Sequence, residues 1–138
     1  MLKIRRGEPA DLAAVAAIQQ ACPEAAQWDV RDYPAYDFTV AGTRDALAGF
    51  LIARRLSTEE SEILNLAVDP RERRKGVARS LVSCFLAESP GDVYLEVRAA
   101  NQVAREFYKS IGFQEISIRK DYYSQPPDAA IVMKFHSC

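Results

Sequence analysis

The turn DPRERRKGVA, residues 69–78, concentrates positive charge beside one glycine. Residues 71–75 comprise one acidic residue, Glu72, and four basic residues, namely Arg71, Arg73, Arg74 and Lys75. An apolar run precedes this turn and a helical pattern follows it. The first amides of a helix lack intrahelical partners and carry partial positive charge, and Gly76 leaves room for a phosphate to approach the backbone. The turn therefore predicts an anion site at the start of a helix. The alternative is a solvated basic turn, since nucleotide-binding loops of the GxxxxGK[ST] or GxGxxG type are absent.

Two side chains further along the chain could exchange protons. The residues of VYLEVR alternate, so Tyr94, Glu96 and Arg98 share one face of a strand. A carboxylate on a strand that is covered by helices costs free energy unless it forms an ion pair or hydrogen bonds. Glu96 is therefore either half of an ion pair, for example with Arg98 or Arg54, or a functional base. Tyr108 follows on the apolar side of a predicted helix, where it is either a core aromatic residue or a proton donor.

The elements that must position these residues follow the order β-α-β-β-β-α-β-α-β-β. Helices are predicted from Pro9 to about Cys22, from about Arg74 or Lys75 to Leu86, and from Asn101 to Ile111. Strands are predicted at residues 1–6, 37–43, 46–57, 61–68, 92–97, 113–119 and 129–135. Residues 24–36 and the aromatic, proline-rich stretch 120–128 are predicted to be loops, the first with about one helical turn. This order implies an α/β (α+β) fold, a mixed sheet covered by helices.

Composition narrows the class of protein. The chain has 138 residues, which suits a single domain over 1–138. The net charge of −1 argues against a general nucleic-acid binder, which carries a large basic excess. The one histidine, His136, argues against a multi-histidine metal site, and three widely spaced cysteines, Cys22, Cys84 and Cys138, argue against a disulfide framework or a zinc site. Without an apolar signal-peptide core or a long apolar run, we expect a cytoplasmic protein that binds neither metal nor membrane.

The arrangement of motifs resembles the GCN5-related N-acetyltransferase (GNAT) family. The pattern [QR]-x-x-G-x-[GA] of that family is matched by Arg73, Gly76 and Ala78. Its N-x-x-A-x-x-x-Y helix is matched by Asn101, Ala104 and Tyr108. The segments LNLAVDP, LEVRAAN, FYKSIGF and IRKDYY are similar to the ribosomal-protein-alanine N-acetyltransferase (RimI) branch. The resemblance implies a mostly antiparallel sheet of about seven strands and transfer of acetyl from acetyl-CoA to an amine.

The resemblance also implies roles for individual residues. Backbone groups of the strand Leu66, Ala67 and Val68 would pair with the pantetheine arm of coenzyme A. The pyrophosphate would be held by the turn and helix start, comprising Arg73, Arg74, Lys75, Gly76, Val77, Ala78 and Arg79. Asn101 would cap its helix and contact the cofactor. Glu96 would be the base, with Glu62 as the rival candidate, and Tyr108 would donate a proton to the departing thiolate.

The acceptor is expected between Trp28 and the tyrosine pair Tyr122 and Tyr123. Neutralising an α-amine at pH 7 costs about 1–1.4 kcal/mol, against about 4.6 kcal/mol for lysine. This difference favours direct transfer to a protein N-terminus, possible partners being ribosomal proteins. The alternatives are a small amine or lysine as the acceptor, because the Trp28–Tyr36 region is short for that branch, or a non-catalytic acetyl-CoA-binding module. Direct nucleic-acid binding is disfavoured because the positive charge is local.

Overall fold

The computed structural model describes residues 2–124 and 126–137. These residues form one seven-stranded sheet in the order β1-β2-β3-β4-β5-β7-β6. The strands are β1 (Lys3–Arg6), β2 (Asp37–Gly42), β3 (Leu47–Ser57), β4 (Glu60–Val68), β5 (Gly91–Arg98), β6 (Gln114–Ser124) and β7 (Pro127–Ser137). All neighbours run antiparallel except β4 and β5. The mixed, mostly antiparallel sheet and the element order predicted from the sequence are confirmed.

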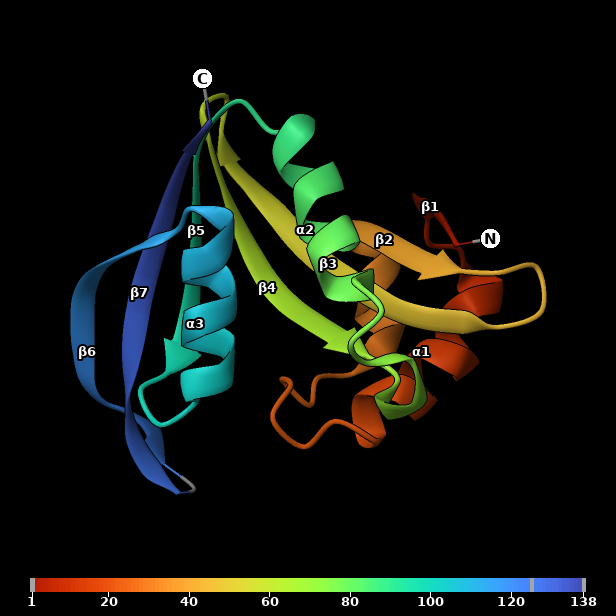
Figure 1. Ribbon diagram of the computed structural model, residues 1–138, viewed down its shortest axis with the longest axis horizontal. Helices are drawn as coiled ribbons and strands as arrows, with labels where there is room; N and C mark the ends of the chain where they lie inside the picture. Colours follow the sequence, from red (N-terminus) through yellow and green to blue (C-terminus); the bar gives the residue numbers. More distant parts are fainter. Residues whose placement is uncertain (1, 125, 138) are drawn as a thin grey trace.

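Helices cover the sheet on both faces (Figure 1). They are α1 (Leu12–Gln20), α2 (Val77–Ala87) and α3 (Gln102–Ile111), with 3-10 turns at Pro9–Asp11, Val30–Ala35 and Pro70–Glu72. Val15 and Ile18 of α1 pack on Phe50 and Ile52 of β3. Leu81 and Val82 of α2 belong to the core on the opposite face, together with the β5 residues Val93, Leu95 and Val97. No helix in the described ranges is long and apolar enough to cross a membrane.

Strands β4 and β5 form the one parallel pair in the described sheet, and they separate after three residues. Their pairing covers only Glu60–Glu62 of β4 and Asp92–Tyr94 of β5. Beyond it the strands diverge, as Figure 1 shows. Leu64 is an extra residue on β4, because Ile63 and Asn65 face consecutive residues of β3, and such a bulge bends a strand away from its neighbour. The sheet is therefore open between the two strands that carry the predicted site.

Two sequence-based boundaries were wrong. Helix α2 begins at Val77 rather than at Arg74 or Lys75, because Arg74 and Gly76 adopt positive φ angles of 66° and 78° that a right-handed helix does not allow. The stretch 120–128 is not simply a loop: β6 extends through Tyr122 and Tyr123 to Ser124, and Pro127 and Asp128 already belong to β7. A register shift between Arg119 and Tyr123 allows this extension, since it absorbs the polar insertion within the ladder.

Candidate active site

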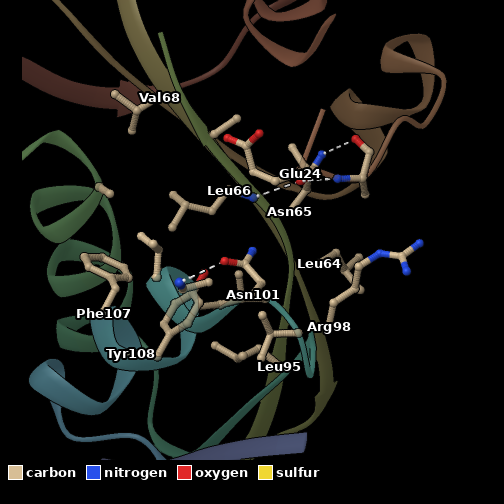
Figure 2. A pocket seen from close by; sticks show the side chains of 18 of the residues that line it. Glu24, Leu64, Asn65, Leu66, Val68, Leu95, Arg98, Asn101, Phe107 and Tyr108 are labelled. Carbon is tan, nitrogen blue, oxygen red and sulfur yellow. Dashed lines mark hydrogen bonds between the residues drawn. The ribbon is translucent and has the colours of Figure 1, made fainter. Parts of the chain in front are cut away.

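A cleft of about 1070 Å³ lies where β4 and β5 separate. It is lined from β4 by residues 62–68, from β5 by 95–98, from the start of α2 by Gly76–Arg79 and from α3 by Asn101, Ala104 and Tyr108. Figure 2 shows Leu66 and Val68 on one side of this space and Asn101 and Tyr108 on the other. All the predicted cofactor, catalytic and acceptor residues line the cleft except Lys75.

The free edge of β4 presents backbone groups to this cleft. Asp69 N–H donates to the carbonyl of Ala48 on β3 at 2.7 Å. In an antiparallel ladder alternate residues direct their backbone groups to opposite edges. Leu66 and Val68 therefore direct theirs away from β3, toward the gap left by β5. Two of these groups already have partners: the Leu66 N–H donates to Asn65 Oδ1 at 3.0 Å, and the Val68 carbonyl accepts from Cys22 Sγ at 3.2 Å. The Leu66 carbonyl and the Val68 N–H fit the predicted pairing of an extended pantetheine arm with the strand edge.

The basic turn is less positive than its sequence suggested. Each of three basic side chains pairs with a carboxylate: Arg71 with Asp69 at 2.9 Å, Arg73 with Glu24 at 2.6 Å and Lys75 with Glu72 at 3.4 Å. Two arginines near the helix start, Arg74 and Arg79, form no ion pair within the described residues. The geometry therefore leaves anion attraction mainly to these two guanidinium groups and to the backbone.

The start of α2 can accept a phosphate. The first intrahelical bond runs from Ser80 N–H to the carbonyl of Gly76 at 3.0 Å, so the amides before Ser80 have no partner within the helix. A Cβ built on Gly76 would meet nothing within 4 Å, so the space beside these amides is open. Arg79 donates to the hydroxyl of Ser110 at 2.6 Å, its guanidinium carbon lies 6.0 Å from the ring centroid of Phe107, and both Arg79 and Phe107 line the cleft. These features fit the pyrophosphate of coenzyme A.

Asn101 and Tyr108 share helix α3. The side chain of Asn101 accepts a hydrogen bond from Ala104 N–H at 3.1 Å, so the predicted N-cap is confirmed. Gly112, with a φ of 124°, closes the other end, where its N–H donates to the carbonyl of Tyr108 at 3.2 Å. Tyr108 packs between Phe107 and Phe113, with ring centroids 5.0 and 5.4 Å away. Burial raises the pKa of the Tyr108 phenol above its ordinary value of 10.

Glu96 lies on the opposite face of β5. Leu95 and Val97 point into the core that contains Tyr108, so the pleat directs Glu96 to the other side of the sheet. Its Oε1 accepts a hydrogen bond from Arg119 at 2.9 Å. Its Oε2 is buried and has no hydrogen-bond partner among the described residues. The cleft passes through the gap in the sheet and so has Glu96 and Tyr108 on its two sides.

The rival base Glu62 is differently placed. It faces Arg54 directly across the β3–β4 ladder and pairs with it, with Arg54 Nη2 2.8 Å from Glu62 Oε1. The ion pair with Arg54 that the sequence suggested for Glu96 thus belongs to Glu62. Glu62 lies where β4 and β5 are still hydrogen-bonded, whereas Glu96 lies beyond the point of separation. Each carboxylate is held at Oε1 by one arginine and both residues line the cleft, so the geometry favours Glu96 only through its place beyond the separation of the strands.

A buried polar network holds the segment after α1 against β4. The Asn65 side chain donates to the Ala26 carbonyl at 3.0 Å and accepts from Ala26 N–H at 3.2 Å. It also donates to Gln19 at 3.2 Å and to the Tyr33 hydroxyl at 3.1 Å, and that hydroxyl donates to Gln19. Gln19 in turn donates to the carbonyl of Trp28 at 2.7 Å. The network sets one wall of the cleft.

Aromatic side chains flank the cleft on the Glu96 side. Trp28 and Tyr122 are both about half exposed, at 49% and 47%. Tyr122 and Tyr123 pack edge to face, with ring centroids 5.1 Å apart. Burial is the main cause that raises the pKa of Tyr123, with Glu96 adding to it. The three predicted acceptor residues therefore line one cavity together with the predicted base.

Sequence reasoning missed four residues of this site: Glu24, Asn65, Phe107 and Arg119. Asn65 could have been noticed as the one polar residue within the apolar run ILNLAV. Phe107 directly precedes Tyr108 on the same predicted helix, where an aromatic residue is most simply explained as part of the core. The partners of Glu24 and Arg119 lie 49 and 23 residues away, and neither has a local pattern that reveals them. Groups of His, Cys, Asp and Glu that could hold a metal ion are absent from the described residues.

A seven-stranded sheet that opens between β4 and β5 over an anion-binding helix start defines the class of protein. Residues 10–113 match the acetyltransferase (GNAT) family, and the chain belongs to that family. It is an N-acetyltransferase, and acetyl-CoA supplies the acetyl group.

Within this family, the chain is similar to bacterial enzymes that acetylate an alanine of a ribosomal protein. The chain is 34% identical over 100 residues to the [ribosomal protein bS18]-alanine N-acetyltransferase of Haemophilus ducreyi, covering 67% of this chain and 68% of that enzyme. It is 39% identical over 95 residues to the Salmonella typhimurium enzyme of the same name, covering 64% of each. The matches thus span about two thirds of these relatives.

Solved structures agree along nearly the whole chain. The crystal structure of the ribosomal-protein-S18-alanine N-acetyltransferase from Escherichia coli superposes with a TM-score of 0.86 at 29% identity, covering 99% of this chain and 94% of that one. The structure of Ard1 from Thermoplasma volcanium gives a TM-score of 0.88 at 30% identity, covering 99% and 98%. The predicted family and branch resemblance are confirmed.

Proposed function

We propose that the chain acetylates the N-terminal α-amine of a protein, with Glu96 as the base and Tyr108 as the acid. The observation that carries the proposal is the cleft through the open sheet, which has the unpartnered Glu96 Oε2 on one side and Tyr108 on the other. The names of the bacterial relatives support an alanine N-terminus as the acceptor. A ribosomal protein is therefore the partner that we propose, in the cytoplasm.

Different residues of the cleft have different roles in the direct transfer of the acetyl group. The bound thioester supplies an activated acetyl carbonyl. Glu96 Oε2 takes the proton that the amine loses as its nitrogen bonds to that carbonyl carbon, and Tyr108 donates a hydrogen bond to the sulfur as the carbon–sulfur bond breaks. The amides at the start of α2 and the edge of β4 hold the rest of the cofactor. No thiol is needed, and Cys22 is buried while its Sγ donates to the Val68 carbonyl at 3.2 Å.

The raised pKa of Tyr108 refines the role of the acid. A thiol has a pKa of about 8.5, so complete proton transfer from a phenol of ordinary pKa 10 is already uphill. Burial raises the phenol pKa further. Tyr108 is therefore a hydrogen-bond donor to developing negative charge, which it stabilises without losing its proton completely.

A competition assay tests the acceptor. Acetyl transfer is measured with three acceptors at equal concentration: a peptide that begins with alanine in a ribosomal sequence, the same peptide with a blocked N-terminus and an internal lysine, and a small amine such as spermidine. We expect kcat/KM to be largest for the free α-amine, because its neutral form costs less at pH 7. Turnover of only the small amine or only the lysine would overturn the proposed acceptor and leave the acetyltransferase class intact.

A further inference from the structure

The carboxylate of Glu96 is held by an arginine from the far edge of the sheet. Arg119 Nη1 lies 2.9 Å from Glu96 Oε1, while the second carboxylate oxygen stays buried without a partner among the described residues. The Glu96 side chain is 19% exposed and that of Arg119 is 54% exposed. The pair therefore joins a sheltered carboxylate to a guanidinium group at the surface.

The sheet is built so that this contact can form across a whole strand. In the β5–β7 ladder Arg98 faces Ala130, and in the β6–β7 ladder Arg119 faces the same Ala130. Cross-strand partners point to the same face of a sheet, so Ala130 lies between the two arginines. Ala130 is fully buried and has only a methyl group. Its small size allows Arg119 to extend over β7 to reach β5.

Aromatic contacts fix the hairpin that carries Arg119. The guanidinium carbon of Arg119 lies 4.3 Å from the ring centroid of Tyr122. On β5, Arg98 lies 4.1 Å from the ring centroid of Tyr123 and donates to the Pro126 carbonyl at 2.8 Å. Stacking limits the rotamers available to a guanidinium group. Arg119 is therefore presented to Glu96 in a restricted orientation.

We propose that Arg119 is a positioning residue for the acetyl transfer: it occupies Glu96 Oε1 and leaves Oε2 as the oxygen that receives the proton of the acceptor amine. The inference rests on the proposed role of Glu96. A carboxylate held at one oxygen by a charged donor cannot rotate freely, so the other oxygen keeps a defined position in the wall of the cleft. Arg119 contacts neither reacting group; it acts through Glu96.

Steady-state kinetics of Arg119→Gln, Arg119→Lys and Glu96→Gln test this role, with Arg55→Gln as a matched control. Arg55 is exposed on β3, and its side chain forms no hydrogen bond or ion pair with the described residues. We expect Arg119→Gln to lower kcat about ten- to a hundredfold, as loss of a charged hydrogen bond does, with the KM for acetyl-CoA unchanged within about twofold. Arg119→Lys should recover part of kcat, and Arg55→Gln should match the wild type.

The double variant separates positioning from folding. In a Glu96→Gln background, Arg119→Gln should change kcat by less than about twofold, because the carboxylate that it positions is absent. An equal loss in both backgrounds would show a merely structural role and overturn the proposal. Wild-type kcat for Arg119→Gln beside an inactive Glu96→Gln would overturn the positioning role alone. Full activity of Glu96→Gln would instead show that Glu96 is not the base, and would overturn the role of Arg119 as well.

Discussion

Arg73 Nη2 lies 2.6 Å from Glu24 Oε1, which joins the turn before α2 to the segment after α1. The same guanidinium group lies 3.6 Å from Cys22 Sγ. Arg73 is the first residue of the motif expected to bind pyrophosphate, yet its charge is directed at the opposite wall of the cleft. The cofactor side and the acceptor side of the site are therefore connected by one ion pair.

Replacing Glu24 with Gln should affect the acceptor more than acetyl-CoA. The pair is about half exposed on both sides, and such pairs contribute at most about 1 kcal/mol. We therefore expect the KM for the peptide to rise by no more than about fivefold, with the KM for acetyl-CoA unchanged or lower because Arg73 becomes free to face a phosphate. Initial-rate kinetics with each substrate varied in turn measure both constants. A rise in the acetyl-CoA KM alone would contradict this prediction.

Gly76→Ala should weaken acetyl-CoA binding without a steric clash in the free protein. The added Cβ meets nothing within 4 Å, so it would project into the open space beside the helix start. The φ of 78° makes alanine unfavourable by about 1 kcal/mol or more. We expect at least a tenfold higher Kd for acetyl-CoA by calorimetry. Gly112→Ala is the control, since its φ of 124° is also strained but it lies outside the cleft. It should lower Tm and leave Kd unchanged.

Tyr108→Phe should lower kcat about a hundredfold, within the usual range for loss of one hydrogen-bond donor to the developing negative charge. The ring contacts with Phe107 and Phe113 need no hydroxyl, so Tm should change little. Because burial raises the phenol pKa above 10, the wild-type phenol stays protonated between pH 6 and 9. The ratio of wild-type to variant kcat should therefore be constant across that range. A ratio that falls toward one as the pH approaches 9 would indicate that Tyr108 ionises there, and would contradict the burial effect.

The site could be predicted from sequence where a local pattern carried it. Helix ends are one such case, because their backbone geometry depends on residues that are close in the chain. Examples are Asn101, Gly112 and the Arg73–Ala78 motif. The pairing of Arg73 could not be predicted, because its partner Glu24 lies 49 residues away in the sequence. The partner of Glu96 was missed for the same reason. Arg119 reaches it only through the order in which β5, β7 and β6 pair, and no spacing along the chain encodes that order.

Asn65→Ala should weaken the packing of the segment after α1 against β4, which forms the wall of the cleft where the acceptor is expected. The Asn65 side chain bonds both backbone groups of Ala26 and donates to Gln19 and Tyr33. Its loss leaves buried polar groups without partners, which costs about 1–3 kcal/mol. We expect a lower free energy of unfolding in urea and a higher KM for the peptide. Gln20→Ala is the matched control, because Gln20 is exposed at the end of α1, next to Gln19, and its side chain forms no hydrogen bond with the described residues. Equal effects of both changes would contradict a specific role for the network.

Asp11 should make the N-terminal region sensitive to acid. It accepts two hydrogen bonds from Arg5, each 2.8 Å long, and one from Glu8 N–H, also 2.8 Å. The hydrogen bonds from Arg5 are the main cause that lowers the pKa of Asp11 below its ordinary value of 3.8. A carboxyl whose pKa is lowered by folding stabilises the folded state above its unfolded pKa, and this stability is lost as the pH falls through the folded pKa.

Asp11→Asn should therefore lower Tm by about 2–6 °C at pH 7, as expected for loss of about 1 kcal/mol. The difference from the wild type should shrink as the pH falls below about 4, where the carboxyl of the unfolded chain takes up a proton, and should vanish below the lowered pKa of the folded state. Thermal unfolding followed by circular dichroism between pH 3 and 7 measures this. Asp45→Asn is the control: Asp45 lies in the turn between β2 and β3 and has no ion-pair partner in the described chain. A Tm difference for Asp11→Asn that stays constant with pH would assign the effect to packing rather than to the ion pair with Arg5.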